Sequence, residues 1–446
     1  MVALTVAAPM ARGDGELGLL SPRAIGHAGA ALVSDDGVGA LFACPAAIAR
    51  RSERRGQVAG LFIDDDVWLA GGDHPRISDR GPAELIPLAG VIGTLGPLVV
   101  GVGVATTASI DRRLPAPEPG LPAETVSADF PHRYAALEAR WTRRTVALGV
   151  AARPTEWLAI GAAATFARVD TTERRRVWAG FGGRDTPLGN PVRDVDVAIA
   201  ATDGFVAGGA IGALLAPGDV PIELALGASW SDDVRAGGEA TVAVARTPVI
   251  GAVLPPTVEA ADARAVGRFG SPLTLHAGVR WVGARFAVEA GATAWTYPSR
   301  ADDAWEITAA RIVDASGASA PIAGLATRIG RRSHGALHGS VDLELLPGFA
   351  WLSAGYGWRG AAQTTPATTL GGVDRGGHTL AFGAELTAGA AIITLGWSRQ
   401  LARTTTVGAP GLPWDNPLAA ETLAANLGIH GHSRDLIAIG LELALR

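Results

Sequence analysis

The sequence predicts an all-β fold: a transmembrane antiparallel β-barrel of about 14 strands with a small N-terminal hatch. Three observations support this prediction. Segments of about ten residues alternate at period two between a bulky apolar face and a face of small or polar residues. The connections between these segments are alternately short and long. Isolated charges lie on the small face, where the core of a soluble sandwich would leave them buried without partners.

The alternation is clearest at the C-terminal end of the chain. In 437–445 every odd-numbered residue is isoleucine or leucine, whereas the even-numbered residues are small apart from Glu442. Such a segment suits a strand with one face toward lipid and the other toward a lumen. The same division recurs in 222–230, 273–281, 341–345, 352–358, 380–386 and 393–397.

Counting the segments between loops gives about 14 strands, an even number that lets the sheet close on itself. Two further segments, 194–201 and 238–249, could raise the count to about 16. The uncharged stretch Leu85 to Ile110 is long enough for a membrane-spanning helix, but Gly96-Pro97 interrupts it and favours a hairpin. The predicted strands are 52–63, 85–94, 97–110, 132–152, 156–172, 205–216, 220–230, 269–281, 283–297, 334–346, 349–360, 376–388, 391–403 and 433–445.

The loops and the two faces indicate which solvent each side meets. Short turns are expected near 96–97, 153–155, 217–219, 283, 347–348 and 388–389, and long loops at 64–84, 111–131, 173–204, 231–268, 298–333, 361–375 and 404–432. Aromatic residues near strand ends on the bulky face predict an interfacial belt, formed by Trp230, Trp281, Tyr356, Trp358 and Trp397. Charges on the small face predict a polar lumen, and the candidates there are Glu223, Arg280, Glu289, Asp342, Glu344, Glu385 and Glu442.

Composition excludes several classes of protein. A net charge of −5 predicts no nucleic-acid partner. The single cysteine, Cys44, excludes an intrachain disulfide framework and a cysteine-rich metal site. Residues 1–14 resemble the remnant of a signal peptide. We therefore divide the chain into this remnant, a hatch at 15–51 and a barrel at 52–446.

The hatch segment carries a specific resemblance. Residues 21–31 read SPRAIGHAGAA, 34–37 read SDDG and 40–46 read ALFACPA. These motifs resemble the N-terminal hatch of the FadL/TodX family of outer-membrane channels for long-chain fatty acids and aromatic hydrocarbons. That hatch typically has a G-x-x-G-A element, an acidic-glycine turn and an Asn-Pro-Ala triplet, and Cys44 stands here in place of the asparagine. Weaker similarity continues through 203–205, 221–230 and 355–358.

The resemblance implies a passive, monomeric channel in the outer membrane of a Gram-negative bacterium. Hydrophobic small molecules would be captured at the extracellular loops and released sideways into outer-membrane lipid through a hatch-gated opening. A strand kink at Gly101 and Gly103 would provide that opening; packing of these glycines against the hatch is the alternative. The implied hatch residues are Gly26, Gly29, Asp36, Gly37, Cys44, Pro45 and Ala46.

No enzymatic site or cofactor is predicted. The run 101–105 lacks the third glycine of a dinucleotide site. His334 and His338, or the acidic run 64–66, could bind a cation, but ordinary polar residues at strand ends explain them as well. Arg280 could engage a substrate carboxylate. The alternative functions are a general porin and a structural or enzymatic outer-membrane barrel.

Overall fold

The computed structural model describes most of the chain. The expected signal-peptide remnant at 1–14 and residues 15–19 of the expected hatch lie outside the described residues. The described residues are 20–71, 74–79, 81–179, 189–245, 256–260, 262–297, 303–313, 317, 319–322, 324–327, 332–371, 375–401, 404–409, 411, 424 and 426–445.

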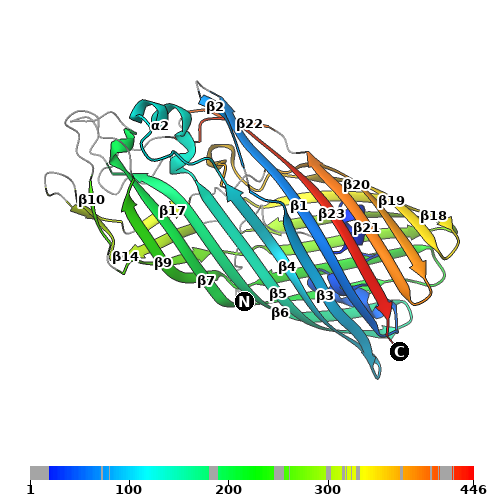
Figure 1. Ribbon diagram of the computed structural model, residues 1–446. Helices are drawn as coiled ribbons and strands as arrows, with labels where there is room; N and C mark the ends of the chain where they lie inside the picture. The colour runs from blue at the N-terminus through cyan, green and yellow to red at the C-terminus, as the bar shows by residue number, and fades with distance from the viewer. Residues whose placement is uncertain are drawn as a thin grey trace, which may run out of the picture.

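The described strands form a closed antiparallel β-barrel of 14 strands (Figure 1), which confirms the predicted fold class and excludes 16 strands. The first and last strands close the ring, in register from Arg55 opposite Ala444 to Ala70 opposite Ile429. In ring order the strands are β1 (Arg55–Gly71), β3 (Glu84–Leu95), β4 (Leu98–Arg113), β5 (Glu138–Thr155), β6 (Leu158–Trp178), β7 (Asp194–Leu215), β8 (Ile222–Ser231), β12 (Leu273–Val282), β13 (Phe286–Thr296), β18 (His334–Leu346), β19 (Ala350–Arg359), β20 (Gly377–Ala388), β21 (Ala391–Leu401) and β23 (Gly428–Ala444).

Several predicted long loops are instead continuations of the barrel wall. The segment 194–201 is the start of the single strand β7, and β9 continues β8 along the edge of β7, so neither adds a strand to the ring. Their inward residues are apolar and pack on one another beyond the membrane, which extends the pairing further than a bilayer requires. The continuing strands are β2 (His74–Ser78), β9 (Val234–Val244), β11 (Arg264–Phe269), β14 (Asp303–Thr308), β17 (Gly324–Thr327) and β22 (Thr405–Val407).

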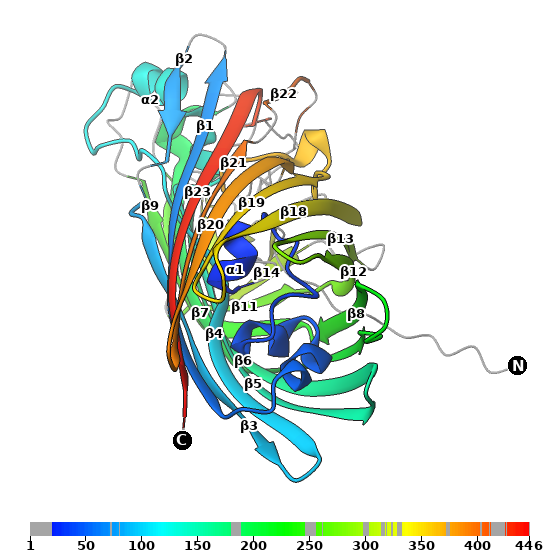
Figure 2. The ribbon, with the colours of Figure 1, turned by 90° about the vertical axis from the view of Figure 1, so that its right-hand side faces the viewer.

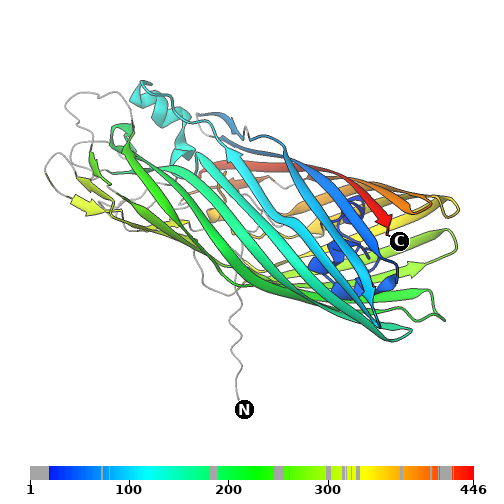
Figure 3. The same cartoon turned by 60° about the horizontal axis from the view of Figure 1, so that its bottom comes forward.

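The short turns all lie at one end of the barrel, which is the periplasmic end in proteins of this architecture (Figure 3). At Gly96-Pro97 a two-residue turn joins Leu95 to Leu98, with Gly96 at φ 61°. The uncharged stretch Leu85 to Ile110 is therefore a hairpin, as predicted. The turn expected at 153–155 lies at 156–157 instead, because an irregularity after Ala152 shifts the register.

The other end carries the long connections. A small separate sheet joins β10 (Thr257–Glu259), β15 (Arg311–Val313) and β16 (Ser319–Pro321). The helices of this end are α2 (Ala123–Asp129), η3 (Pro131–Tyr134), η4 (Pro191–Arg193) and η5 (Thr365–Ala367). Among the described residues, no helix is long and apolar enough to cross a membrane.

The outward face of the barrel is an apolar band. Along β5 the outward residues Val146, Leu148 and Val150 are exposed, while the inward Ala147 and Ala151 are buried. Trp230, Tyr356 and Trp358 are also exposed on this face, and Trp397 stacks on the exposed Phe382. Large apolar side chains that remain exposed all around a closed barrel identify a membrane-facing surface.

We expect Leu148→Arg to reduce the free energy of unfolding in lipid vesicles by about 2–4 kcal/mol, because Leu148 lies within the apolar band. Denaturant titration of the vesicle-inserted protein measures this change. The control is Thr241→Arg, at an exposed position of the extracellular strand β9, which should leave the free energy nearly unchanged. Equal effects of the two substitutions would contradict the assignment of the membrane band.

Candidate functional site

Residues 20–51, which we call the luminal segment, lie inside the barrel toward its short-turn end (Figure 2). The segment contains α1 (Pro22–Gly26), η1 (Val38–Phe42) and η2 (Pro45–Arg50). The first helix contacts β19, β20, β21 and β23, whereas η2 contacts β4, β5, β6 and β7 on the opposite wall. The segment therefore spans the lumen and shares a buried apolar cluster with the barrel wall.

Local chemistry explains why this segment folds into short helical pieces. The Ser21 side chain caps α1 by accepting a hydrogen bond from the Ala24 N–H at 3.1 Å, and Pro22 occupies the first turn. The chain then reverses at Ala28 and Gly29, which have φ of 53° and 93°. A second turn forms where the Gly37 N–H donates to Asp35 Oδ1 at 3.2 Å.

Glycines on the inner wall let the luminal segment approach the strands closely. A Cβ on Gly161 would lie 2.5 Å from the Ala46 nitrogen, and one on Gly227 would lie 2.3 Å from the Ala43 oxygen. Gly26 in turn lies against Gly383, where an added Cβ would meet the strand backbone at 2.8 Å. Part of the glycine content thus reflects the seat of the segment rather than strand flexibility.

Cys44 lies in this seat between β7 and β8. Its Sγ is 3.4 Å from the Leu226 carbonyl oxygen, and the residue is 1% exposed. Burial raises the pKa of the thiol to about 11, so the thiol stays protonated at neutral pH. The neighbouring Pro45 and Ala46 pack directly on Gly161.

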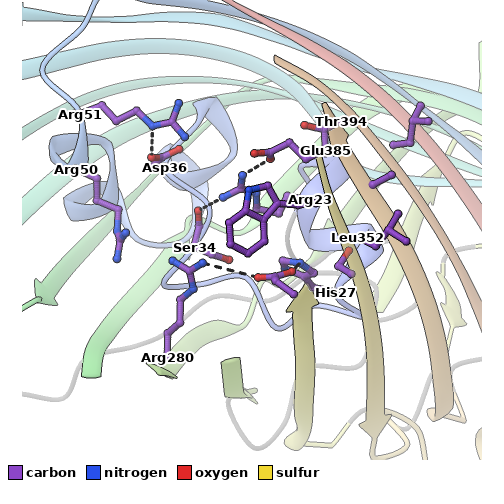
Figure 4. A pocket seen from close by; sticks show the side chains of 15 residues that line it. Arg23, His27, Ser34, Asp36, Arg50, Arg51, Arg280, Leu352, Glu385 and Thr394 are labelled. Atoms are coloured by element: carbon purple, nitrogen blue, oxygen red, sulfur yellow. Dashed lines mark hydrogen bonds and ion pairs between the residues drawn. The ribbon is translucent and has the colours of Figure 1, made fainter. Parts of the chain in front are cut away.

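A network of ion pairs joins the luminal segment to the wall, around a cavity of about 330 Å³ (Figure 4). Arg23 pairs with Glu385, and Arg50 pairs with Glu223. On the wall, Arg280 reaches Glu223 at 3.7 Å. The further members connect Asp342 with His27 at 2.6 Å and with Arg280 at 3.8 Å, and Glu442 with Arg51 at 3.2 Å and Arg55 at 3.5 Å.

Asp36 is the acidic centre of this network. Its oxygens lie 2.8 Å from Arg51 Nε and 3.4 Å from an Arg55 nitrogen. Burial by itself would raise the pKa of this carboxyl, but the surrounding arginines outweigh it and hold the pKa below its usual range. Asp36 is therefore a carboxylate at neutral pH.

The structure brings six of the seven predicted lumen residues to the luminal segment or its ion-pair network. Glu289 accepts hydrogen bonds from the backbone N–H groups of Val33 and Ser34, at 2.7 and 3.2 Å. Glu344 is the exception, since it accepts from the Gly348 N–H in a short turn. Alternation identifies an inward carboxylate, but it does not tell whether that carboxylate lies beside the luminal segment or at the rim.

Gly101 and Gly103 remain paired within the wall. Gly101 is in register with Ile92 of β3 and with Gly149 of β5, and Gly103 faces Val38 and Leu41 of the luminal segment. These contacts match the packing alternative for the two glycines. Backbone pairing between β3 and β4 starts at the turn between Leu95 and Leu98 and runs as far as Leu88 and Ala105. It stops there, at the residue next to Pro87.

Beyond Pro87 the two strands are bridged by side chains. Ser109 donates a hydrogen bond to Glu84, and β4 has an irregularity at Thr107. A small cavity behind this interruption is lined by residues of the luminal segment, β1, β3, β4 and β23, including Leu20, Pro22, Pro87 and Thr106. The wall thus has a stretch without backbone pairing next to the luminal segment.

Two adjoining cavities of about 120 and 140 Å³ lie on the extracellular side of the luminal segment. Both are lined by His276 and Trp295. The His276 Nδ1 is 3.2 Å from the Thr293 hydroxyl, and His338 Nδ1 is 2.7 Å from the Ala28 carbonyl oxygen. The larger cavity is further lined by Ile25 and Leu436 and has a mainly apolar wall, with Gln400, Arg359 and Arg434 among its polar groups.

Trp295 was not singled out from the sequence. It is 7% exposed and its ring stacks on His334 at 4.7 Å between centroids. Strand alternation could have identified it, because Trp295 lies an even number of residues from the inward Glu289 and therefore shares its face. An aromatic residue on the polar face of a barrel strand is therefore informative about the lumen.

The cation candidates have other partners. His334 stacks on Trp295, and His338 contacts the luminal segment. In the acidic run 64–66, Asp65 is held by Arg112 at 2.7 Å and by Arg434 at 2.8 Å. Within the described parts of the chain, no group of three or more His, Cys, Asp or Glu residues is arranged to hold a metal ion.

The whole chain resembles solved outer-membrane channels in structure. A FadL homologue of Pseudomonas aeruginosa superposes with a TM-score of 0.74 at 13% identity, covering 97% of this chain and 100% of that one. This chain has the fold of that FadL homologue. The toluene transporters TodX of P. putida and TbuX of Ralstonia pickettii give TM-scores of 0.67 and 0.66 at 12% and 14% identity; the matches cover 97% and 96% of this chain and 100% and 99% of theirs.

No protein-family model matches the sequence, and no curated protein matches it. The resemblance first noted in residues 21–46 is therefore supported by the structural superposition, which spans almost the full chain. At such low identity the superposition establishes a shared fold, and a shared fold does not by itself establish a shared function.

We expect Gly161→Val to displace η2, because overpacking of about 1–3 kcal/mol would be placed on the Ala46 backbone. The readout is the labelling rate of Cys44, the only cysteine, by a pyridyl disulfide. The rate should rise by about tenfold or more. Gly218→Val, in a short turn with nothing within 4 Å of the added Cβ, should label like the wild type. Slow labelling of both variants would disprove the close packing of η2 on Gly161.

Removing the charge of Asp36 should loosen the luminal segment. Asp36→Asn leaves Arg51 and Arg55 without this carboxylate, at a cost of about 3–5 kcal/mol. Because the folded pKa is lowered, the contribution of Asp36 is present above a pH of about 4 and is lost as the pH falls through the lowered pKa. Cys44 labelling as a function of pH measures both effects. Asp170→Asn, on the outer surface, is the control and should change neither.

Proposed function

We propose that the protein is a channel in the outer membrane of a Gram-negative bacterium for the passive uptake of hydrophobic compounds such as fatty acids or hydrocarbons. The observation that carries the proposal is the filled lumen: the luminal segment occupies the interior and leaves small cavities, of which the one lined by Trp295 and His338 has a mainly apolar wall. The structural neighbours, named as a FadL homologue and as toluene transporters, support this function. The proposal assigns no catalytic residue, cofactor or metal.

Capture begins at the extracellular end. There the inward faces of the extended strands form an apolar cluster that includes the rings of Trp141, Phe269 and Trp305, with neighbouring centroids 5.1 Å apart. Ala108 belongs to this cluster and also lines the cavity beside Trp295. An apolar ligand would follow these side chains from the loop surface to the lumen, and its passage requires the three buried rings to move apart.

The cavities at His276 and Trp295 form the lumen site. The indole ring offers a flat apolar surface, and the imidazoles of His276 and His338 supply hydrogen-bonding groups at its edge. The small volumes favour a compact ligand or one segment of a long chain, with enlargement requiring movement of the luminal segment.

Exit is proposed at the interruption between β3 and β4 rather than at Gly101 and Gly103. Pro87 has no N–H to donate, so this part of β3 cannot complete the ladder with β4. The adjacent cavity connects Pro87 with Pro22 of the luminal segment, which acts as the hatch. Release through the wall delivers an apolar ligand into lipid without crossing water. One chain closes the whole barrel through β1 and β23, so we propose a monomer.

Loss of the lumen aromatic should weaken ligand binding. We expect Trp295→Ala to reduce the affinity for toluene or a fatty acid by about tenfold, since the substitution removes an aromatic surface worth about 1 kcal/mol or more. The measurement is uptake of radiolabelled ligand into vesicles that contain the protein. Trp157→Ala, whose side chain is exposed in a short turn away from these cavities, is the control. Equal losses in the two variants would argue against this lumen site.

A cross-link across the proposed exit should block release. In a Cys44→Ser background, Glu84→Cys with Ser109→Cys joins two positions whose side chains are hydrogen-bonded. Oxidation should abolish uptake, and a reductant should restore it. The control pair Leu148→Cys and Ala164→Cys links strands that are already paired and should transport in both states. Rapid swelling of the same vesicles in sugar solutions would instead indicate a general porin.

A further inference from the structure

The outer surface of β4, β5 and β6 carries a group of exposed arginines just beyond the apolar band. Proposed transport through the lumen makes no use of them. They form salt bridges whose acidic members lie deeper, since the Asp111 side chain is 4% exposed while that of Arg113 is 54% exposed. We call the following group the arginine face: Arg113, Arg140, Arg144, Arg168 and Arg174.

The lower edge of the arginine face has an unusual pairing. Arg144 and Arg168 are directly opposite on neighbouring strands, an arrangement that is unfavourable for like charges. Both guanidinium groups contact one carboxylate, Asp170, at 3.5 and 3.0 Å, and Asp170 also accepts from the Thr202 hydroxyl at 2.9 Å. Two exposed cations therefore share a single anion, and one positive charge is left for an external partner.

The next outward rung toward the membrane is apolar. Val146 lies opposite Phe166, directly below the arginine pair. Phe205 lies beside Phe166, with ring centroids 5.6 Å apart, and is 67% exposed. It projects because β7 has an extra residue here: Val206 pairs with Ala167 and Asp203 with Val169, which leaves Gly204 and Phe205 facing one residue of β6. The motif 203–205 noted in the sequence is thus a bulge that displays an aromatic ring.

We propose that this surface binds a phosphorylated glycolipid of the outer leaflet. The two guanidinium groups of Arg144 and Arg168 are placed to bind a headgroup phosphate, for which arginine has the matching planar donors. Phe166 and Phe205 pack against the acyl chains immediately below. The surface commits to a lipid rather than to a free anion, because the cationic and aromatic parts are adjacent along the membrane normal.

The opposite wall provides a matched reference. Arg399 of β21 is also exposed on the outward face, two residues from Trp397, but it has Asp435 as a partner at 3.4 Å that it shares with no other arginine in the described residues. It therefore has the same residue type and nearly the same position, without the surplus charge. Removing it tests whether any outward arginine would give the same effect.

The experiment measures binding of a bisphosphorylated glycolipid to the full chain in detergent by native mass spectrometry, beside the same lipid with its phosphates removed. We expect at least about tenfold preference for the phosphorylated lipid. Arg144→Gln with Arg168→Gln should remove this preference, whereas Arg399→Gln should keep it. Phe205→Ala should weaken the binding of both lipids and leave the preference for the phosphorylated lipid unchanged.

Several outcomes would overturn the proposal. These are equal binding of the two lipids, an equal loss in the Arg399→Gln variant, and displacement of the lipid by millimolar inorganic phosphate. If the double variant does not fold, Arg144→Gln alone removes the facing like charges and should lose about half of the preference on a logarithmic scale. Hydrocarbon uptake should be normal in all these variants, so failure here is distinguishable from failure of the transport function.

Discussion

The constraint on which the structure depends is that backbone N–H and C=O groups in hydrocarbon must find partners within the protein. The pairing of β1 with β23 satisfies it, because this contact turns an open sheet into a ring without edges. Closure then forces one face of every strand outward into lipid and the other inward. The interruption beside Pro87 is significant against this background, since it is a place where the wall is held by a side-chain bridge and not by the ladder.

The second level of organisation is the way the interior is filled. A luminal segment of about thirty residues is too small for a core of its own. Its apolar side chains are therefore buried against apolar side chains of the barrel wall, in one shared cluster. Glycines such as Gly161 and Gly227 remove the side chains that would hold the segment away. Charged groups such as Arg23 and Glu385 then fix its position, because each would be costly to bury alone.

The period-two pattern predicted the barrel well because lipid imposes one requirement on all strands at once. It predicted the inward carboxylates Glu223, Glu289 and Asp342 for the same reason. It failed where that requirement ends: β7 continues past the membrane because Val195, Val197 and other apolar residues pack on the extracellular cluster, a contact invisible in one strand alone. The role expected of Gly101 and Gly103 remains a prediction, although their contacts with the luminal segment offer a simpler reason for them.

By itself, the sequence determined the class of fold, the face that each strand turns to lipid and the presence of an N-terminal segment with its own motifs, whereas it left the strand number open between 14 and 16. These properties are local, since alternation and turn residues act within a few positions. Only the tertiary structure decided which charges meet, that Trp295 and His276 share cavities, and that Arg144 lies opposite Arg168. Those facts depend on register between distant strands, and register is set by closure of the whole ring.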